Sequence, residues 1–237
     1  NVAPSGGGRC DFELWTNAAY NIADVSAIKV NCSQGVNVSL TWVPHHANST
    51  WAAQCHGYQY NPAPETVTVG AITTTTQVHL SGSSHGVGQT ITYSTLPDGN
   101  PETTMFVSVV NVSNAKAAPR ARAEVENAIK SGYSTLHAQH RRWWNQYYTD
   151  GSFLSISDTL LESFYWTNMY KLASATRHDR VVYDLMGPWY IEGTNWPDLH
   201  WDLNVQLTYW PLFTANKIEM VGSLTNLLRA QQANLIS

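Results

Sequence analysis

A short segment in the last fifth of the chain concentrates side chains that suit the binding of a sugar. From Trp196 to Pro211 the sequence holds three tryptophans, two carboxylates, a histidine, an asparagine and a glutamine. The C–H faces of a pyranose ring stack on indoles, and its hydroxyl groups need hydrogen-bond donors and acceptors held at fixed angles. Apolar packing alone does not require these polar groups. The composition therefore predicts a carbohydrate site.

The backbone of this segment decides where its side chains point. In an extended segment the side chains alternate, so His200, Asp202 and Asn204 lie on one side. Trp201 and Leu203 then lie on the other. The alternative is a helix start in which Asp202 is the N-cap and the indoles belong to the core.

The first half of the chain has the pattern of antiparallel strands. From Val36 to Trp42 apolar and polar residues alternate, which places Asn37 toward solvent. Other short runs rich in Val, Ile and Thr are Val25 to Val30, Glu65 to Ile72, Thr76 to Leu80, Gln89 to Thr95 and Thr104 to Val112. Because no helical window separates these runs, we expect a β-sandwich rather than βαβ units.

The composition changes near Lys116 to that of helices. Helices are predicted from Pro119 to Lys130, from Ser134 to Tyr148, from just after Ser157, from just after Leu203 to about Ala215 and from Lys217 onward. In the third helix a stripe is expected to be buried, formed by Leu161, Phe164, Tyr165, Asn168 and Leu172. The apolar end at Ser237 carries no helix stop signal, which predicts cleavage or truncation there.

Composition excludes several classes of partner. Only 13% of the 237 residues are charged and the formal net charge is −4, whereas soluble proteins average about 25% charged residues. The chain has no excess of basic residues with which to bind nucleic acid or anionic lipid. It also contains no run of eighteen apolar residues, which a membrane-spanning helix would need. The nine histidines show no metal-ligand spacing with acidic residues or cysteines. We expect no metal and no cofactor.

Four Asn-x-Ser/Thr sequons, at Asn31, Asn37, Asn48 and Asn111, predict a secreted, glycosylated protein. Three cysteines, Cys10, Cys32 and Cys55, lie in the same half and match no zinc pattern, so we expect one disulfide. Three pairings are possible, and the sequence does not choose among them.

The motif His200-x-Asp202-x-Asn204-x-Gln206-x-x-Tyr209-Trp210-Pro211 resembles the His-x-Asn-x-Asn-x-Gln-x-x-Tyr-Trp-Pro signature of glycoside hydrolase family 95. All marked positions but one agree. Weaker support comes from Asn216-x-x-Glu219 and from the helix that carries His137, His140, Trp143 and Trp144. The resemblance implies an α+β chain with a partial β-sandwich over 1–115, linker helices over 116–151 and, over 152–237, the start of an (α/α)6 barrel. A continuation or a second chain would complete that barrel.

The family consists mainly of inverting α-L-fucosidases. Inversion uses a general acid and a base about 6.5–9.5 Å apart, and in the family both lie far downstream of the asparagine pair that holds the attacking water. By position, the resemblance implies that Asp202 and Asn204 are the catalytic, water-positioning groups. The substrate-binding groups are then expected to be His200, Trp196, Gln206 and Trp201. A carboxylate only accepts hydrogen bonds, so Asp202 would orient or deprotonate the water, or mark a different sugar or a lapsed enzyme. The alternative function is a non-catalytic carbohydrate-binding or structural glycoprotein.

Overall fold

The computed structural model describes residues 10–18, 25–32, 63–79, 89–98, 102–185, 187 and 199–236. The chain divides into two compact units, Asn1–Trp144 and Asn145–Ser237, here called the sheet unit and the helical unit. Their boundary lies within the long helix α3 (Tyr133–Thr149). Within the described ranges, every helix is too short or too polar to cross a lipid bilayer. The domain limits at 115 and 151 stay predictions.

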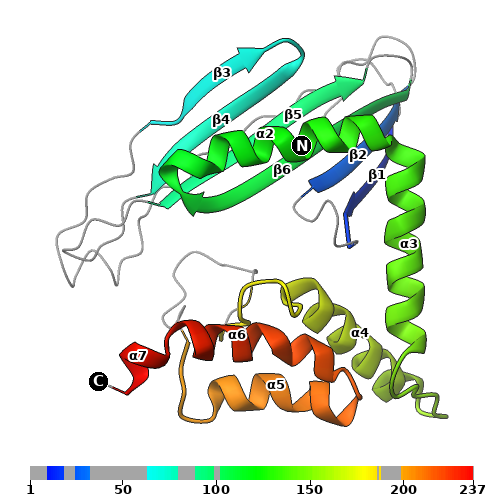
Figure 1. The fold of residues 1–237 in the computed structure, drawn as a ribbon. Coiled ribbons are helices and arrows are strands. Elements are labelled where there is room, and N and C mark those ends of the chain that lie inside the picture. The colour runs from blue at the N-terminus through cyan, green and yellow to red at the C-terminus, as the bar shows by residue number, and fades with distance from the viewer. Residues whose placement is uncertain are drawn as a thin grey trace. The chain divides into compact units, whose positions relative to one another are not determined.

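The sheet unit is built on an antiparallel sheet with the strand order β1-β2-β6-β5-β4-β3 (Figure 1). The strands are β1 (Cys10–Thr16), β2 (Val25–Cys32), β3 (Glu65–Val69), β4 (Ile72–His79), β5 (Gln89–Asp98) and β6 (Glu102–Ser113). This sheet and its helices confirm the α+β class. The described residues contain no second sheet, and the run from Val36 to Trp42 lies outside them. The sandwich and the barrel therefore stay predictions.

One predicted strand is wrong, because the run from Glu65 to Ile72 is interrupted by a hairpin. Strand β3 ends at Val69, and β4 begins at Ile72 after a two-residue turn. Gly70 has a φ of 64°, a conformation that glycine adopts without the steric penalty of a side chain. Hydroxyl pairs Thr66–Thr75 (3.0 Å) and Thr68–Thr73 (3.1 Å) then link the two strands. The glycine between two apolar runs was the available signal for this turn.

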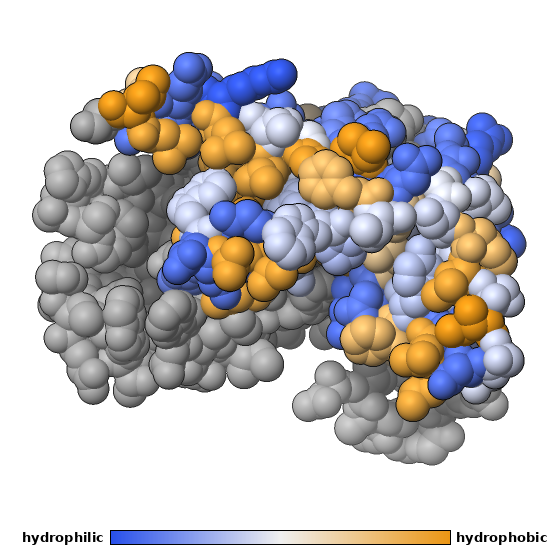
Figure 2. All heavy atoms as spheres, turned by 90° about the horizontal axis from the view of Figure 1, so that it is seen from below, coloured by the Kyte–Doolittle hydropathy of each residue, from blue (hydrophilic) through white to orange (hydrophobic). Residues whose placement is uncertain are grey.

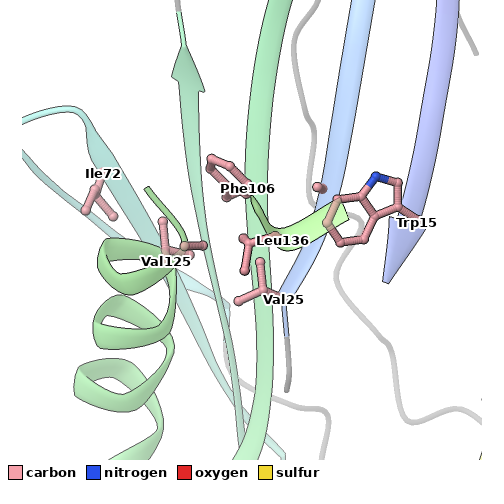
Figure 3. Close-up of a cluster of buried hydrophobic side chains, with 8 residues drawn as sticks. Trp15, Val25, Ile72, Phe106, Val125 and Leu136 are labelled. Carbon is pink, nitrogen blue, oxygen red and sulfur yellow. The ribbon is translucent and has the colours of Figure 1, made fainter. Parts of the chain in front are cut away.

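Helix α2 (Asn114–Ser131) packs on one face of the sheet (Figures 1 and 3). It begins five residues before Pro119, the predicted start, because it follows directly from β6. Small side chains let the helix approach closely, since Ala117 and Ala121 pack against Val110. Further along, the shared core consists of Trp15, Val25, Ala27, Ile72, Phe106, Val125, Ala128 and Leu136. Burying a single Val, Leu or Phe side chain stabilises the fold by about 1.5–3 kcal/mol.

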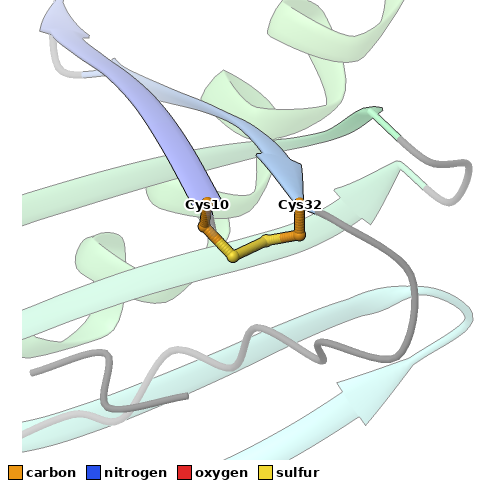
Figure 4. Close-up of a disulfide and its surroundings, with 2 residues drawn as sticks. All are labelled: Cys10 and Cys32. Carbon is orange, nitrogen blue, oxygen red and sulfur yellow. A yellow bond between two sulfur atoms is a disulfide. The ribbon is translucent and has the colours of Figure 1, made fainter. Parts of the chain in front are cut away.

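The predicted disulfide joins Cys10, the first residue of β1, to its register partner Cys32, the last residue of β2 (Figure 4). The structure thereby selects one of the three possible pairings, and Cys55 lies outside the described residues. The link spans 22 positions of sequence. By lowering the entropy of the unfolded chain, it raises the free energy of unfolding by about 3 kcal/mol.

The helical unit contains α4 (Thr159–Ala175), α5 (Asn204–Thr214), the 3₁₀ helix η1 (Ile218–Val221), α6 (Gly222–Ala230) and α7 (Gln232–Leu235). Helix α4 begins where predicted because Asp158 Oδ1 accepts hydrogen bonds from the backbone N–H groups of Leu160 (3.0 Å) and Leu161 (3.1 Å). After α4, residues 176–185 form no helix or strand. Residues 186 and 188–198 lie outside the described residues.

The predicted buried stripe of α4 is largely wrong. Leu161 and Phe164 are 56% and 68% exposed, whereas the buried residues are Met169, Leu172 and Ala173. Apolar residues occur around most of this helix, so their spacing did not identify the packed side. The Tyr147 hydroxyl of α3 donates to the backbone oxygen of Met169 at 2.8 Å, which marks the side that α3 covers.

Candidate functional site

The predicted site residues lie in a closed turn rather than in an extended segment. Residues 201–203 form the turn, and α5 begins at Asn204. The N–H of Leu203 donates to the oxygen of Trp201 (2.8 Å), and the N–H of Val205 donates to that of His200 (3.0 Å). The alternation expected for His200, Asp202 and Asn204 is therefore wrong. The N-cap alternative is also wrong, because Leu203 occupies that position and no side chain caps the helix.

Leu203 is the residue that bends this segment. Its φ of 76° is in the left-handed region, which disfavours a side-chain-bearing residue by about 1–2 kcal/mol. The backbone reverses there, and α5 starts immediately after Leu203. Nothing in the sequence signalled this, because leucine is not a residue that selects left-handed turns. Strain of this kind is found where the surrounding structure holds a functional geometry.

The turn presents three consecutive side chains to solvent. Trp201 is 40% exposed, Leu203 is 56% exposed and Asp202 between them is exposed as well. His200, before the turn, is half-buried. The indole and the carboxylate are thus both accessible at the tip of a hydrogen-bonded loop. This is an arrangement in which a sugar ring can stack while one of its hydroxyl groups donates to the carboxylate.

The remaining predicted site residues divide into three positions. Asn204 is the half-buried first residue of α5, and its backbone oxygen accepts a hydrogen bond from the Thr208 hydroxyl at 2.9 Å. Gln206 is exposed on the same helix, but residues two apart on a helix point about 200° away from each other. Asn204 and Gln206 therefore face different sides. Trp196 lies outside the described residues.

Helix α5 carries apolar residues on opposite sides. Val205, Tyr209 and Leu212 are buried, whereas Leu207, Trp210 and Phe213 are each slightly more than half exposed. Figure 2 shows apolar side chains, in orange, at the surface of the helical unit. Helices that are apolar all round are typical of elements covered on every side. The buried side fixes the helix, and the other side is open to a further layer.

Tyr209 anchors the helix that follows the turn. Its hydroxyl accepts the backbone N–H of Tyr183 at 2.8 Å and lies 2.8 Å from the hydroxyl oxygen of Ser223. Because Ser223 donates to the oxygen of Met220 (3.3 Å), Tyr209 is the donor to Ser223. The side chain is 1% exposed. The motif position Tyr209 therefore has a structural role that its spacing did not reveal.

Replacing Tyr209 with phenylalanine is expected to reduce the free energy of unfolding by about 1–3 kcal/mol, because the Tyr183 N–H loses its acceptor. Urea unfolding followed by circular dichroism measures the change. Tyr170→Phe is a suitable control, since Tyr170 is 50% exposed and surface changes stay within about 0.5 kcal/mol. Equal losses in the two variants would contradict the role given to Tyr209.

The far end of α5 is held against the end of α3. The Lys217 ammonium donates to the backbone oxygens of Tyr147 and Asp150 and lies 4.3 Å from the centre of the Tyr147 ring. Burial lowers the pKa of Lys217, and the charge of Asp150 opposes that shift. The N–H of Ser152 also donates to the backbone oxygen of Ala215 at 2.9 Å. Both ends of α5 are therefore fixed, one by the turn and one by this contact.

The residues that gave weaker support to the resemblance belong to both units. Asn216 adopts a φ of 54° after α5, and Glu219 is 78% exposed, 3.8 Å from the His178 ring. His137 and His140 lie in the sheet unit. Among the described residues, no group of three or more His, Cys, Asp or Glu side chains is placed to hold a metal ion.

No family model matches the chain, and no curated protein matches it. A solved structure does match, with a TM-score of 0.51 and 10% sequence identity, and it is described as a putative kojibiose phosphorylase from human microbiome. This chain shares its fold with part of that protein. The match covers 75% of this chain but only 25% of the other. At such low identity the likeness concerns the fold alone. It does not single out glycoside hydrolase family 95.

Proposed function

We propose that this chain is part of a secreted carbohydrate-active enzyme, a glycosidase similar to inverting α-L-fucosidases. The observation that carries the proposal is the closed turn at 200–205, which holds an accessible indole and an accessible carboxylate at consecutive positions. The fold shared with a protein named as a phosphorylase of a sugar supports the same class of substrate.

In this proposal the turn holds the side chains that bind the sugar and the water in fixed directions. Two backbone hydrogen bonds and the left-handed Leu203 hold its conformation before any ligand arrives, so binding requires little further ordering. Trp201 offers an apolar face to the sugar ring. Asp202 and Asn204 hold the attacking water, with Asp202 accepting a hydrogen bond from it. His200, with Trp196, completes the binding groups. Gln206 faces another side of α5 than Asn204 and has no part in this site, and the general acid comes from outside this turn.

We propose further that additional helices cover the open sides of α4 and α5. These helices belong to a continuation of the chain or to a second chain that completes a barrel. The support is the apolar surface: Leu160 is 78% exposed and Phe164 68%, and α5 exposes Trp210 and Phe213. The matched protein is also about four times as long as the region that this chain covers.

Secretion remains a proposal supported by the sequons and by the disulfide. Asn31 is exposed on β2, as a glycan attachment site requires. Asn37 and Asn48 lie outside the described residues, as does the side chain of Asn111.

A second candidate function is carbohydrate binding without catalysis. It is favoured by one observation, the aspartate at 202 where the family signature has asparagine. In that case the turn would bind a glycan and leave it intact. Measurements of glycan binding and of glycan cleavage distinguish the two candidate functions.

The proposed function is tested by incubating the full-length protein with fucosylated and galactosylated glycans and following the products by proton NMR. Hydrolysis with inversion is expected to release the β-anomer of the sugar first, without any need for phosphate. If a sugar phosphate appears, and only when inorganic phosphate is added, the reaction is phosphorolysis rather than hydrolysis. Binding without any product would favour the second candidate. The absence of both binding and product would contradict both candidate functions.

A further inference from the structure

A ring cluster in the sheet unit joins α3 to β1. The Trp15 indole packs against the rings of Tyr133, His137 and His140, with centroid distances of 5.6, 5.6 and 5.0 Å. Its N–H donates to the Tyr133 hydroxyl at 3.1 Å. Trp15 is 9% exposed and belongs to the core drawn in Figure 3. The two histidines are therefore part of the packing between a helix and an outer strand of the described sheet.

His140 is placed to act as a hydrogen-bond acceptor. Its Nδ1 accepts the backbone N–H of Ala18 at 3.3 Å, just beyond the end of β1. An acceptor nitrogen carries no proton, so the neutral ring has its proton on Nε2. A further backbone hydrogen bond involves Thr16. Burial, followed by the charge of His137, lowers the pKa of His140, and the bond to Thr16 opposes the shift.

His137, one turn earlier on α3, makes a separate contact with β1. Its Nε2 lies 3.2 Å from Glu13 Oε1. The other groups facing the cluster are Lys29 of β2, the register partner of Glu13, whose ammonium lies 5.6 Å from the Tyr133 ring centre, and the Tyr133 hydroxyl. Burial raises the pKa of Tyr133, which therefore stays neutral in acid.

We propose that the α3–β1 contact is an acid-sensitive joint in which His140 releases the end of β1. A proton taken from solvent occupies Nδ1, and the resulting N–H faces the N–H of Ala18, so the hydrogen bond is lost. The His137–Glu13 contact lies on the same face of the strand and keeps α3 linked to β1. Acid thus loosens one end of the contact without detaching the helix.

The direction of the pH dependence follows from the lowered pKa of His140. In the unfolded chain a histidine has a pKa of about 6.5, so between the two values the unfolded state binds more protons. The stability that His140 contributes is complete above about pH 6.5 and is lost as the pH falls through its folded-state pKa.

The joint is tested by recording ¹⁵N-¹H correlation spectra of the protein from pH 4 to pH 8. The Ala18 amide signal is expected to shift with a midpoint below pH 6.5, together with the ring signals of His140. His140→Asn should abolish that transition. His137→Gln should keep it and move its midpoint to higher pH, since the repulsion between the two rings is removed.

Two results would overturn the proposal. One is a wild-type Ala18 amide that shows no transition over this range, and the other is a transition that persists in the His140→Asn variant. Wild-type ¹⁵N shifts of the His140 ring add a check that needs no variant, because a protonated Nδ1 at pH 8 also contradicts the proposed acceptor role.

Discussion

Asp202→Ala is expected to lower the turnover number for the sugar substrate by about 10²–10⁴-fold, the usual contribution of a positioned acid–base group. The side chain is exposed and caps no helix. Its removal should therefore change the free energy of unfolding by no more than about 0.5 kcal/mol. Initial rates on the glycan, compared with urea unfolding of the same samples, give both quantities.

Two further variants sharpen this experiment. Asp202→Asn restores the asparagine of the family signature, so it keeps most activity when residue 202 only holds the water and loses it when the carboxylate takes the proton. Glu219→Ala removes another exposed carboxylate of the helical unit and should leave the rate unchanged. An unaltered rate in Asp202→Ala would show that this carboxylate has no part in the reaction.

Gly151→Ala is expected to reduce the free energy of unfolding by about 2–5 kcal/mol. Gly151 has a φ of 91°, and an added Cβ would lie 2.5 Å from the backbone oxygen of Ala215 and 3.2 Å from that of Asn216. The conformation contributes about 1–2 kcal/mol and the forced contact about 1–3 kcal/mol. Ala215 cannot easily retreat, because its oxygen also accepts the Ser152 N–H.

Gly132→Ala is the matched control for this substitution. Gly132 has a φ of 75° but no atom within 4 Å of the added Cβ, so only the conformational part applies. Urea unfolding should therefore show a clearly larger loss at 151 than at 132. Equal losses would mean that the contact between the end of α3 and the end of α5 is looser than the distances indicate.

Much of the secondary structure followed from local chemistry in the sequence. The predicted β2, β5 and β6 agree because their Val, Ile and Thr runs are bounded by turn residues, and α4 starts at the Asp158 cap. Strand β1 was missed because its seven residues, Cys10–Thr16, include two acidic side chains and no long apolar run. The buried side of α4 depended on which neighbour packed there, and spacing carries no such information.

The candidate site was less predictable than the helices around it. The residue types that suit a sugar were visible in the sequence, but their directions depended on one left-handed leucine. Leu203 turns the chain, so Asp202 lies at the tip of a loop and Asn204 at the start of a helix. The anchoring of α5 by Tyr209 was also hidden, since its partners Tyr183 and Ser223 are 26 and 14 residues away.

Sugar binding at the turn is tested most directly by a ¹⁵N-¹H NMR titration of the protein with L-fucose and, separately, L-galactose. The indole N–H of Trp201 and the side-chain amide of Asn204 are expected to shift in a saturable way with the same dissociation constant. The buried Trp15 indole of the sheet unit should not move. Saturable shifts confined to residues outside 200–206, or no shifts with either sugar, would contradict a sugar site at this turn.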